Sequence, residues 1–230
     1  DKTNNIEAIK FRLVTDNGII NKITLNKKEV TLEKESKDSL SVSFRPTNTM
    51  MGKTIHWSSS NDKIVTVDQN GNIHAVGVGN ATITAETVNG VKATCEVKSI
   101  ISISSIKLDK VDETIEKGKI TQLNATINPN DTTEDKTLEW TSSNPSVATV
   151  DQNGKVKAVS GGDTTITVKS KNGKEAKCQI NVISHIESVS LNKKELKVEK
   201  TNTEALQATI NPSDATDDKT LKWKSEDESI

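Results

Sequence analysis

The sequence predicts an all-β protein, built as a tandem array of β-sandwich modules that form an elongated rod. Three observations predict this fold class. Landmark residues recur every 83 residues, apolar and polar residues alternate within each repeat, and Asn-Gly pairs separate the alternating segments. Alternation with a period of two is typical of a strand with one buried face. The repeat, as long as the segment from Trp57 to Trp140, has the size of a small autonomous sandwich domain.

The same interval relates all the landmarks of the chain. It separates Trp57 from Trp140, and again Trp140 from Trp223. The further landmarks at this interval are Pro46, Pro129 and Pro212; Leu40, Leu123 and Leu206; Cys95 and Cys178; Gly71 and Gly154; and Gly79 and Gly162. Self-similarity at a fixed period is the signature of repeated structural units. We therefore predict modules at residues 21–103, 104–186 and 187–230, of which the third holds 44 of the 83 positions.

Residues 1–20 precede the repeat, and we expect them to be a leader or the end of a different domain. Ile9, Phe11 and Leu13 alternate there, but out of step with the alternation of the repeat. The chain opens at Asp1 rather than at a methionine and stops within a repeat. We therefore expect it to be a fragment of a longer protein.

Within each module the expected strands follow in order. Leu40, Val42 and Phe44 alternate with polar residues, which predicts a strand with one buried face, and the alternation continues in further segments. These segments predict strands over 64–67, 72–76, 81–87 and 91–97. Asn-Gly pairs at 70–71, 89–90, 153–154 and 172–173 predict hairpins with type I′ turns, which connect the strands into a meander. A sustained helical period is missing, so we expect essentially no helix.

The joints between modules follow the same interval. Ile20, Ile103 and Ile186 recur, and Ile100 matches Ile183. The joining segments lack the composition of flexible linkers. We therefore expect these isoleucines to bury apolar surface at the module boundaries and to restrict bending.

Composition excludes several classes of partner. Apolar residues make up 32% of the chain, which suits several thin cores better than one thick core. The 31 basic and 32 acidic residues give a net charge of −1 and form no basic patch, so neither nucleic acid nor direct membrane insertion is expected. No apolar run reaches the length of a membrane span.

The chain resembles the bacterial Ig-like group 2 module. The resemblance rests on Leu123-Asn-Ala-Thr-Ile-Asn-Pro129, on Leu138-Glu-Trp140-Thr-Ser-Ser-Asn, and on the segment from Val147 to Gly154. It implies an Ig-like sandwich of the kind that occurs in tandem on bacterial surface proteins, adhesins, secreted hydrolases and phage virions, usually as a spacer and sometimes as a binder. The family's usual glycine before the third strand is matched by Gly118, whereas Glu35 and Thr201 take that place in the other repeats.

The histidines and cysteines predict no chemistry. His56, His74 and His185 do not recur at the interval and lack partners at the spacing of metal ligands or of a catalytic triad. We therefore expect no catalytic residue, no cofactor and no enzyme activity. Each complete module has one cysteine at the same strand position, so Cys95 and Cys178 are expected to be buried, reduced and inert.

The tryptophans could form a platform that stacks sugars or pack in the cores. Trp57, Trp140 and Trp223 recur beside apolar residues, and Phe11 and Phe44 are the only other aromatic residues of the chain. Core packing is the favoured interpretation, similar to the buried strand tryptophan of Ig sandwiches.

Acidic loops are the best candidate for a metal site. The recurring carboxylates are Asp131, Glu134 and Asp135 in the second repeat and Asp214, Asp217 and Asp218 in the third. Hard cations such as calcium prefer clustered carboxylate oxygens. The first repeat has Asn48, Met51 and Gly52 at these places, and the EF-hand pattern is missing. A solvated loop is the favoured interpretation, with calcium as the alternative.

Three hypotheses for function follow. The first is a non-catalytic spacer or stalk of a bacterial cell-surface, secreted or virion protein. The second is an adhesive array that binds a host or envelope ligand, or neighbouring copies in an assembly. The third is an accessory region of a secreted hydrolase whose catalytic domain lies outside this chain. All three place the protein outside the cell or at its surface.

Overall fold

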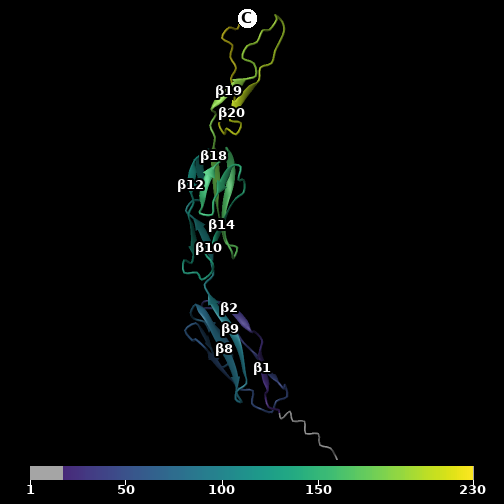
Figure 1. Cartoon of the computed structure of the whole chain (residues 1–230), viewed down its shortest axis with the longest axis vertical. Helices are drawn as coiled ribbons and strands as arrows, with labels where there is room; N and C mark the ends of the chain where they lie inside the picture. The colour runs from purple at the N-terminus through teal and green to yellow at the C-terminus, as the bar shows by residue number, and fades with distance from the viewer. Residues whose placement is uncertain (1–17, 230) are drawn as a thin grey trace, which may run out of the picture. The chain divides into compact units, whose positions relative to one another are not determined.

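The computed structural model describes residues 18–229 (Figure 1), and all regular secondary structure in that range is β-strand. The chain divides into two compact units, Asp1–Ser102 and Ile103–Ile230. The all-β prediction is confirmed. Of the leader proposed for residues 1–20, residues 1–17 lie outside the described residues. The alternation at Ile9, Phe11 and Leu13 lies there as well.

The first module contains nine strands in three sheets. A four-stranded sheet has the order β2-β9-β8-β5, a three-stranded sheet the order β3-β7-β6, and β1 pairs with β4. The strands are β1 (Lys22–Leu25), β2 (Glu29–Glu33), β3 (Lys37–Ser39), β4 (Val42–Arg45), β5 (Ile55–Ser59), β6 (Val65–Val67), β7 (Asn72–Ala75), β8 (Gly79–Thr87) and β9 (Lys92–Ile100). All strand pairs are antiparallel except β2–β9, which is parallel.

The second module repeats this topology strand for strand. Its sheets have the orders β11-β18-β17-β14 and β12-β16-β15, β10 pairs with β13, and β11–β18 is the parallel pair. The strands are β10 (Ser105–Leu108), β11 (Asp112–Glu116), β12 (Ile120–Gln122), β13 (Ala125–Asn128), β14 (Leu138–Ser142), β15 (Ala148–Val150), β16 (Lys155–Ala158), β17 (Gly162–Ser170) and β18 (Glu175–Ile183). The register repeats as well, because Ile83 pairs with Cys95 and Ile166 pairs with Cys178.

Each module has one core, to which all three sheets contribute. Trp57 and Trp140 are each 6% exposed and lie in these cores with the apolar residues of the long strands. Ile103 is a core residue of the second compact unit and is 1% exposed. It continues the inward-facing set that includes Ile106 on β10. The expectation that it would also bury apolar surface at a joint stays a prediction.

The Asn-Gly hairpins form, but their turn type differs from the prediction. A type I′ turn needs positive φ at both central residues. In the β6–β7 hairpin Gly71 has a φ of 81°, whereas Asn70 is not among the described residues with positive φ. The Gly71 N–H donates to the Asp68 carbonyl at 3.1 Å, and the Asp68 N–H donates to the Asn72 carbonyl at 2.9 Å. The loop is therefore a three-residue turn that the glycine closes.

Gln152 completes the exposed edge of strand β14. In the β15–β16 turn its side-chain amide accepts the Trp140 N–H at 3.1 Å and donates to the Trp140 carbonyl at 3.1 Å. One side chain therefore satisfies both backbone groups of the core tryptophan, as a neighbouring strand would. Gln69 makes the equivalent contacts with Trp57 at 3.5 and 3.4 Å.

The position of the family's usual glycine takes a left-handed conformation in every repeat. Gly118 has a φ of 85°, Glu35 of 69° and Thr201 of 79°. This conformation costs a residue with a side chain roughly 1–2 kcal/mol, while glycine adopts it freely. Glu35 and Thr201, which replace the family's glycine, therefore add conformational strain at this position but leave the path of the backbone unchanged.

We expect Glu35→Gly to stabilise the first module by about 0.5–1 kcal/mol, because glycine removes the strain but adds backbone entropy to the unfolded chain. Gly118→Ala is the reciprocal control: a side chain there meets no atom within 4 Å, so its cost is conformational. Urea unfolding followed by NMR amide signals of each module measures both changes. A loss of stability in Glu35→Gly would contradict the strain argument.

The third repeat is represented by one strand pair and the loops around it. Strands β19 (Ser188–Leu191) and β20 (Ala208–Asn211) pair antiparallel, in the same way as β10 and β13. Trp223 was predicted to be a core residue, but it is 57% exposed. The equivalents of β15–β18, which cover Trp140 in the second module, lie outside the described residues, so the core role of Trp223 stays a prediction. We call residues 187–229 the half-module.

Candidate functional site

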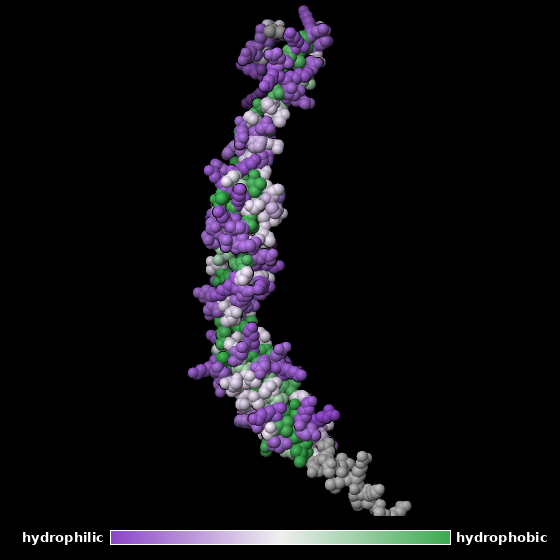
Figure 2. Space-filling view, in the orientation of Figure 1, coloured by the Kyte–Doolittle hydropathy of each residue, from purple (hydrophilic) through white to green (hydrophobic). Residues whose placement is uncertain are grey.

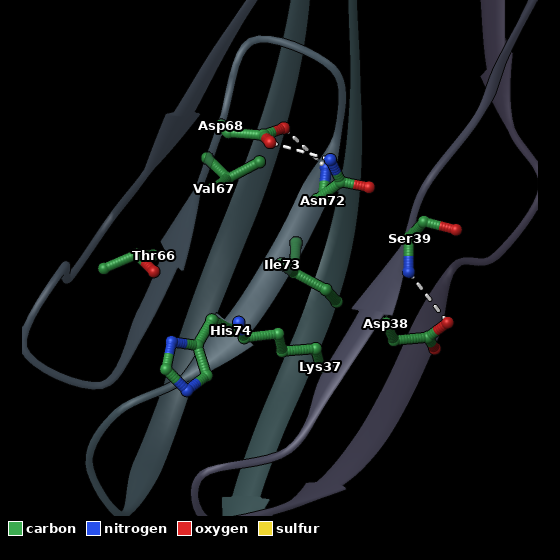
Figure 3. A pocket seen from close by; sticks show the side chains of 9 residues that line it. All are labelled: Lys37, Asp38, Ser39, Thr66, Val67, Asp68, Asn72, Ile73 and His74. Atoms are coloured by element: carbon green, nitrogen blue, oxygen red, sulfur yellow. Dashed lines mark hydrogen bonds between the residues drawn. The ribbon is translucent and has the colours of Figure 1, made fainter.

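A shallow, solvent-facing hollow lies on the outer face of the three-stranded sheet of the first module (Figure 3). His74 stands in the middle of it, with Lys37 opposite it on β3 and Thr66 opposite it on β6. The period of the strands turns these side chains outward and Ile73 inward. The lining residues are Lys37, Asp38, Ser39, Thr66, Val67, Asp68, Asn72, Ile73 and His74.

The carboxylates of this hollow are engaged in local structure. Asp68 accepts the N–H groups of Asn70 at 2.9 Å and Asn72 at 2.8 Å, and the Asn72 side chain at 2.7 Å. These hydrogen bonds lower the pKa of Asp68. Asp38 pairs with Lys27 Nζ at 2.6 Å, which lowers the pKa of Asp38. Both carboxylates therefore stabilise the loop and strand that carry them.

The hollow has different chemistry in the two modules. In the first module Lys37 lies opposite His74, and in the second Ile120 lies opposite Lys157 at the equivalent places. Thr66, Val67 and Asp68 recur as Thr149, Val150 and Asp151, and Asp151 also accepts two backbone N–H groups of its own turn. The turn aspartate is therefore shared, whereas the outward-facing pair Lys37 and His74 is specific to the first module.

The histidines lie apart from one another. His74 Nε2 is 3.8 Å from Glu35 Oε2, and His185 Nδ1 is 3.0 Å from Asp217 Oδ1. His56 points outward from edge strand β5. Each histidine therefore occupies a surface position with at most one carboxylate partner recorded in the described structure.

The acidic loop of the second module holds the start of that module in place. Glu134 Oε2 accepts the Ile103 N–H at 2.6 Å and the Asn172 side chain at 2.7 Å. Asp135 accepts the Thr137 N–H at 2.8 Å and forms an ion pair with Lys171, which lowers the pKa of Asp135 strongly. These two carboxylates therefore contact different partners and do not converge on a common point.

The acidic loop of the half-module is engaged in the same manner. Asp217 Oδ2 accepts the Ile186 N–H at 2.6 Å, and Asp218 accepts the Thr220 N–H at 2.9 Å. Asp214 contacts the second module instead. Within residues 18–229, no group of three or more His, Cys, Asp or Glu side chains has a geometry that could hold a metal ion. The hydrogen bonds described for Glu134, Asp135, Asp214, Asp217 and Asp218 thus hold loops and the junction to the half-module.

Cys95 and Cys178 are free thiols with no exposed surface. Burial raises the pKa of both thiols, and raises that of Cys178 to about 11. Because the thiolate is the nucleophile and the metal ligand, these thiols are unreactive at neutral pH. They act as small apolar core residues.

Two kinds of residue escaped the sequence analysis. The edge-satisfying glutamines Gln69 and Gln152 do recur at the interval that relates the tryptophans, and that recurrence was the available signal. Lys117 and Ser160 carried no signal, because their role depends on a loop that is distant in the sequence.

Hydrophilic residues cover most of the face shown in Figure 2. None of the described residues form a helix long and apolar enough to cross a membrane.

Repeated sandwiches with a buried strand tryptophan and a parallel pairing of an early strand with the last strand define a tandem Ig-like protein. The chain belongs to the bacterial Ig-like domain (group 2) family, whose model matches residues 19–97 and 102–180. The resemblance stated from the sequence is therefore confirmed.

Curated relatives match parts of much longer proteins. A protein of Clostridium acetobutylicum is 35% identical over 186 residues, which is 78% of this chain and 19% of the relative. The kappa-carrageenase of Pseudoalteromonas carrageenovora is 42% identical over 85 residues, which is 36% of this chain and 21% of the enzyme. The chain thus spans about a fifth of the length of these two relatives.

Solved structures with a similar fold include surface proteins. The S-layer protein rSbsC matches 75% of this chain and 29% of its own, with 21% identity and a TM-score of 0.36. A C-terminal fragment of intimin, solved with the intimin-binding domain of its translocated receptor, matches 76% of this chain and 67% of its own, with 17% identity and a TM-score of 0.38.

Proposed function

We propose that this chain is a non-catalytic spacer in a bacterial protein that acts at the cell surface, in the medium or on a virion. One observation carries the proposal: the residues that recur between the two modules serve the fold. Trp140, Cys178 and Gly154 lie in the core or in the turn that packs against it. Two outward-facing residues of the hollow, Lys37 and His74, are replaced by Ile120 and Lys157 in the second module. A spacer needs a stable repeated fold and places no demand on a particular surface.

The surface supports the same proposal. Protein-binding hot spots are enriched in Trp, Tyr and Arg near the centre of an interface. The chain has no Tyr. Trp57 and Trp140 are buried. Trp223 is 57% exposed, and the surface of the two complete modules carries many Lys, Asp and Glu residues, which are typically depleted at interface cores.

The test is an exchange of modules within the protein that carries them. Residues 21–186 are replaced by two Ig-like modules of similar length and unrelated surface, and in a second variant they are deleted. A spacer predicts that the exchange preserves the activity of the whole protein and that the deletion reduces it. Loss of activity on exchange, with both inserted modules folded, would contradict the proposal and favour adhesion.

A second candidate is the accessory region of a carbohydrate-degrading enzyme. It is favoured by the relatives, because a 3-O-alpha-D-galactosyl-alpha-L-arabinofuranosidase of Bifidobacterium longum is 40% identical over 85 residues, in addition to the kappa-carrageenase. The chain covers 7% of the arabinofuranosidase. Binding of the isolated chain to an array of polysaccharides would favour this candidate over the spacer, and failure to bind any of them would favour the spacer.

An adhesive role is the third candidate, with a host or envelope ligand or neighbouring copies as partners. The hollow around Lys37 and His74 is where such binding would be sought first, because these two residues are specific to the first module. The double variant Lys37→Ile, His74→Lys places the second module's residues there. Any ligand bound by the wild type and lost in this variant would assign the hollow as its site.

A further inference from the structure

One short loop of the half-module contacts the body of the second module, while Asp217 binds the connecting residues His185 and Ile186. This loop, Asp214-Ala-Thr216, follows β20, and we call it the docking loop. The part of the second module that it contacts consists of Lys117, Ser160, Gly161 and Ser184, which we call the acceptor face. Lys117 follows β11, Ser160 and Gly161 precede β17, and Ser184 follows β18. The acceptor face therefore gathers three segments that are far apart in the sequence.

Asp214 makes the central contact. Its carboxylate oxygens lie 3.0 and 2.9 Å from Lys117 Nζ. Oδ2 also accepts the Ser160 hydroxyl at 2.7 Å and the Gly161 N–H at 2.9 Å. An ionised carboxylate that accepts several hydrogen bonds, one of them from an ammonium group, is held in a defined position.

Thr216 adds a backbone contact on the other side of Ala215. Its N–H donates to the Ser184 carbonyl at 2.7 Å, and the Ser184 N–H donates to Thr216 Oγ1 at 3.1 Å. Ala215, between the two contact residues, is 5% exposed. Among the described residues 187–229 it is the one buried apolar side chain. The docking loop is therefore the best-packed part of the half-module.

Gly161 is the steric counterpart of the docking loop. A Cβ atom at this position would lie 2.2 Å from the Asp214 carbonyl oxygen and 2.9 Å from Thr216 Cγ2. Gly161 is not among the described glycines with positive φ, so the backbone itself would accept alanine. The missing side chain thus serves the close approach of the loop, and the requirement for glycine arises from the junction.

We propose that the acceptor face is a specific docking site for the Asp-Ala-Thr loop of the module that follows, and that this docking holds the junction in one arrangement. The inference deepens the proposed spacer function, because a spacer with a fixed junction transmits position and force along the chain. The junction depends on charge and close backbone contact. The isoleucines expected there, Ile183 and Ile186, are half-buried.

The contact between the docking loop and the acceptor face is expected to persist in mild acid. Lys117, the Gly161 N–H and the Ser160 hydroxyl, in that order, hold the pKa of Asp214 well below its usual 3.8. Because the pKa of Asp214 is lowered in the folded state, its carboxylate stabilises the docked loop fully at any pH above the usual pKa. This stabilisation is lost only as the pH falls through the lowered pKa. His185, the titratable neighbour at this junction, pairs with Asp217. Protection of the Thr216 amide is therefore expected to be equal at pH 7 and pH 5 after correction for intrinsic exchange.

The test uses the full chain labelled with ¹⁵N and measures hydrogen exchange of the Thr216 amide, together with residual dipolar couplings of β17 and β20. Asp214→Asn removes the charge, and Gly161→Ala adds one methyl group at the point of contact. We expect exchange at Thr216 to accelerate at least about tenfold in both variants, because the amide is then protected only by local structure. In the wild type, we expect one alignment tensor to fit the residual dipolar couplings of both strands. In the two variants, we expect the couplings of β17 and β20 to require separate tensors.

Matched controls separate docking from folding. Asp218→Asn changes a carboxylate of the same acidic loop that contacts Thr220. Gly52→Ala adds a methyl group where no atom lies within 4 Å. Both controls should leave the Thr216 amide and the couplings unchanged, and the amides of Ile166 and Val168 should stay protected in every variant. If Gly161→Ala also reduces the protection of these core amides, that variant affects folding, and the docking proposal is then tested by Asp214→Asn alone.

The proposal is overturned if Thr216 exchanges equally fast in the wild type and in Asp214→Asn, or if the wild-type couplings already require two tensors. These outcomes are independent of the spacer proposal. A fixed junction in a chain that proves to bind a ligand contradicts the spacer and leaves the dock intact. A loose junction in a chain whose modules can be exchanged contradicts the dock and leaves the spacer intact.

Discussion

Trp140→Ala is expected to unfold the second module. The indole is 6% exposed and lies in the core, where its strand pairs with β17 at Val168. Truncation of a buried tryptophan costs about 3–5 kcal/mol, from lost burial and from the cavity that remains. The free energy of unfolding of a small domain can be as low as about 5 kcal/mol. The variant should therefore lose most of the stability of this module. Urea unfolding followed by amide signals of β17 and β18 measures the change.

Trp223→Ala is the matched control, because this tryptophan has the equivalent place in its repeat and lies outside the core of the second module. Its effect on the unfolding of the second module is expected to stay within about 0.5 kcal/mol, as for most surface substitutions. The amide signals of the first module should be unchanged in both variants. A stable second module in Trp140→Ala would show that the indole is not a core residue and would restore the possibility of an aromatic binding surface.

Gly154→Ala is expected to be nearly as damaging. A Cβ atom there would lie 2.4 Å from the Leu123 carbonyl oxygen and 2.9 Å from Trp140 Cζ2, and the backbone φ is 80°. The left-handed conformation costs an alanine about 1–2 kcal/mol. Overpacking against a rigid carbonyl and an indole adds about 1–3 kcal/mol. We therefore expect a loss of about 3 kcal/mol in the free energy of unfolding of the second module.

Gly173→Ala isolates the conformational part of that loss. Gly173 also follows an asparagine in a hairpin and has a φ of 89°, but a Cβ atom there meets nothing within 4 Å. Its expected cost is about 1–2 kcal/mol, the conformational term alone. Both variants are compared by urea unfolding at one pH. Equal losses in the two variants would contradict the steric argument for Gly154.

Local patterns of the sequence predicted the strands and most of the core. Alternation at Leu40, Val42 and Phe44 reports which face of a strand is buried, because the side-chain period of a strand is two. Cys95 and Cys178 were assigned to the core by the same parity. The turn type escaped prediction, because Asn-Gly is compatible with several hairpin loops, and the Asp68 side chain stabilises the one that forms.

The acidic loop shows why the candidate site could not be predicted. Asp214 looked like a weak metal ligand because it recurs with other carboxylates. Its observed partners, Lys117 and Ser160, lie 97 and 54 residues away in the sequence. A carboxylate can pair with a cation, a metal or a backbone N–H, and the sequence does not record which of them comes within hydrogen-bonding distance.

The sequence alone determined that this protein is a tandem array of β-sandwich modules, because the fixed interval between landmarks and the period of two are properties of the chain itself, and the family resemblance identified these modules as Ig-like. Only the tertiary structure decided which of two similar residues is sterically required. Gly154 and Gly173 both follow an asparagine and have positive φ, but a Cβ atom meets the Leu123 carbonyl oxygen and the Trp140 indole only at Gly154. That difference depends on the strands packed against each turn, and those contacts join segments that local patterns do not connect.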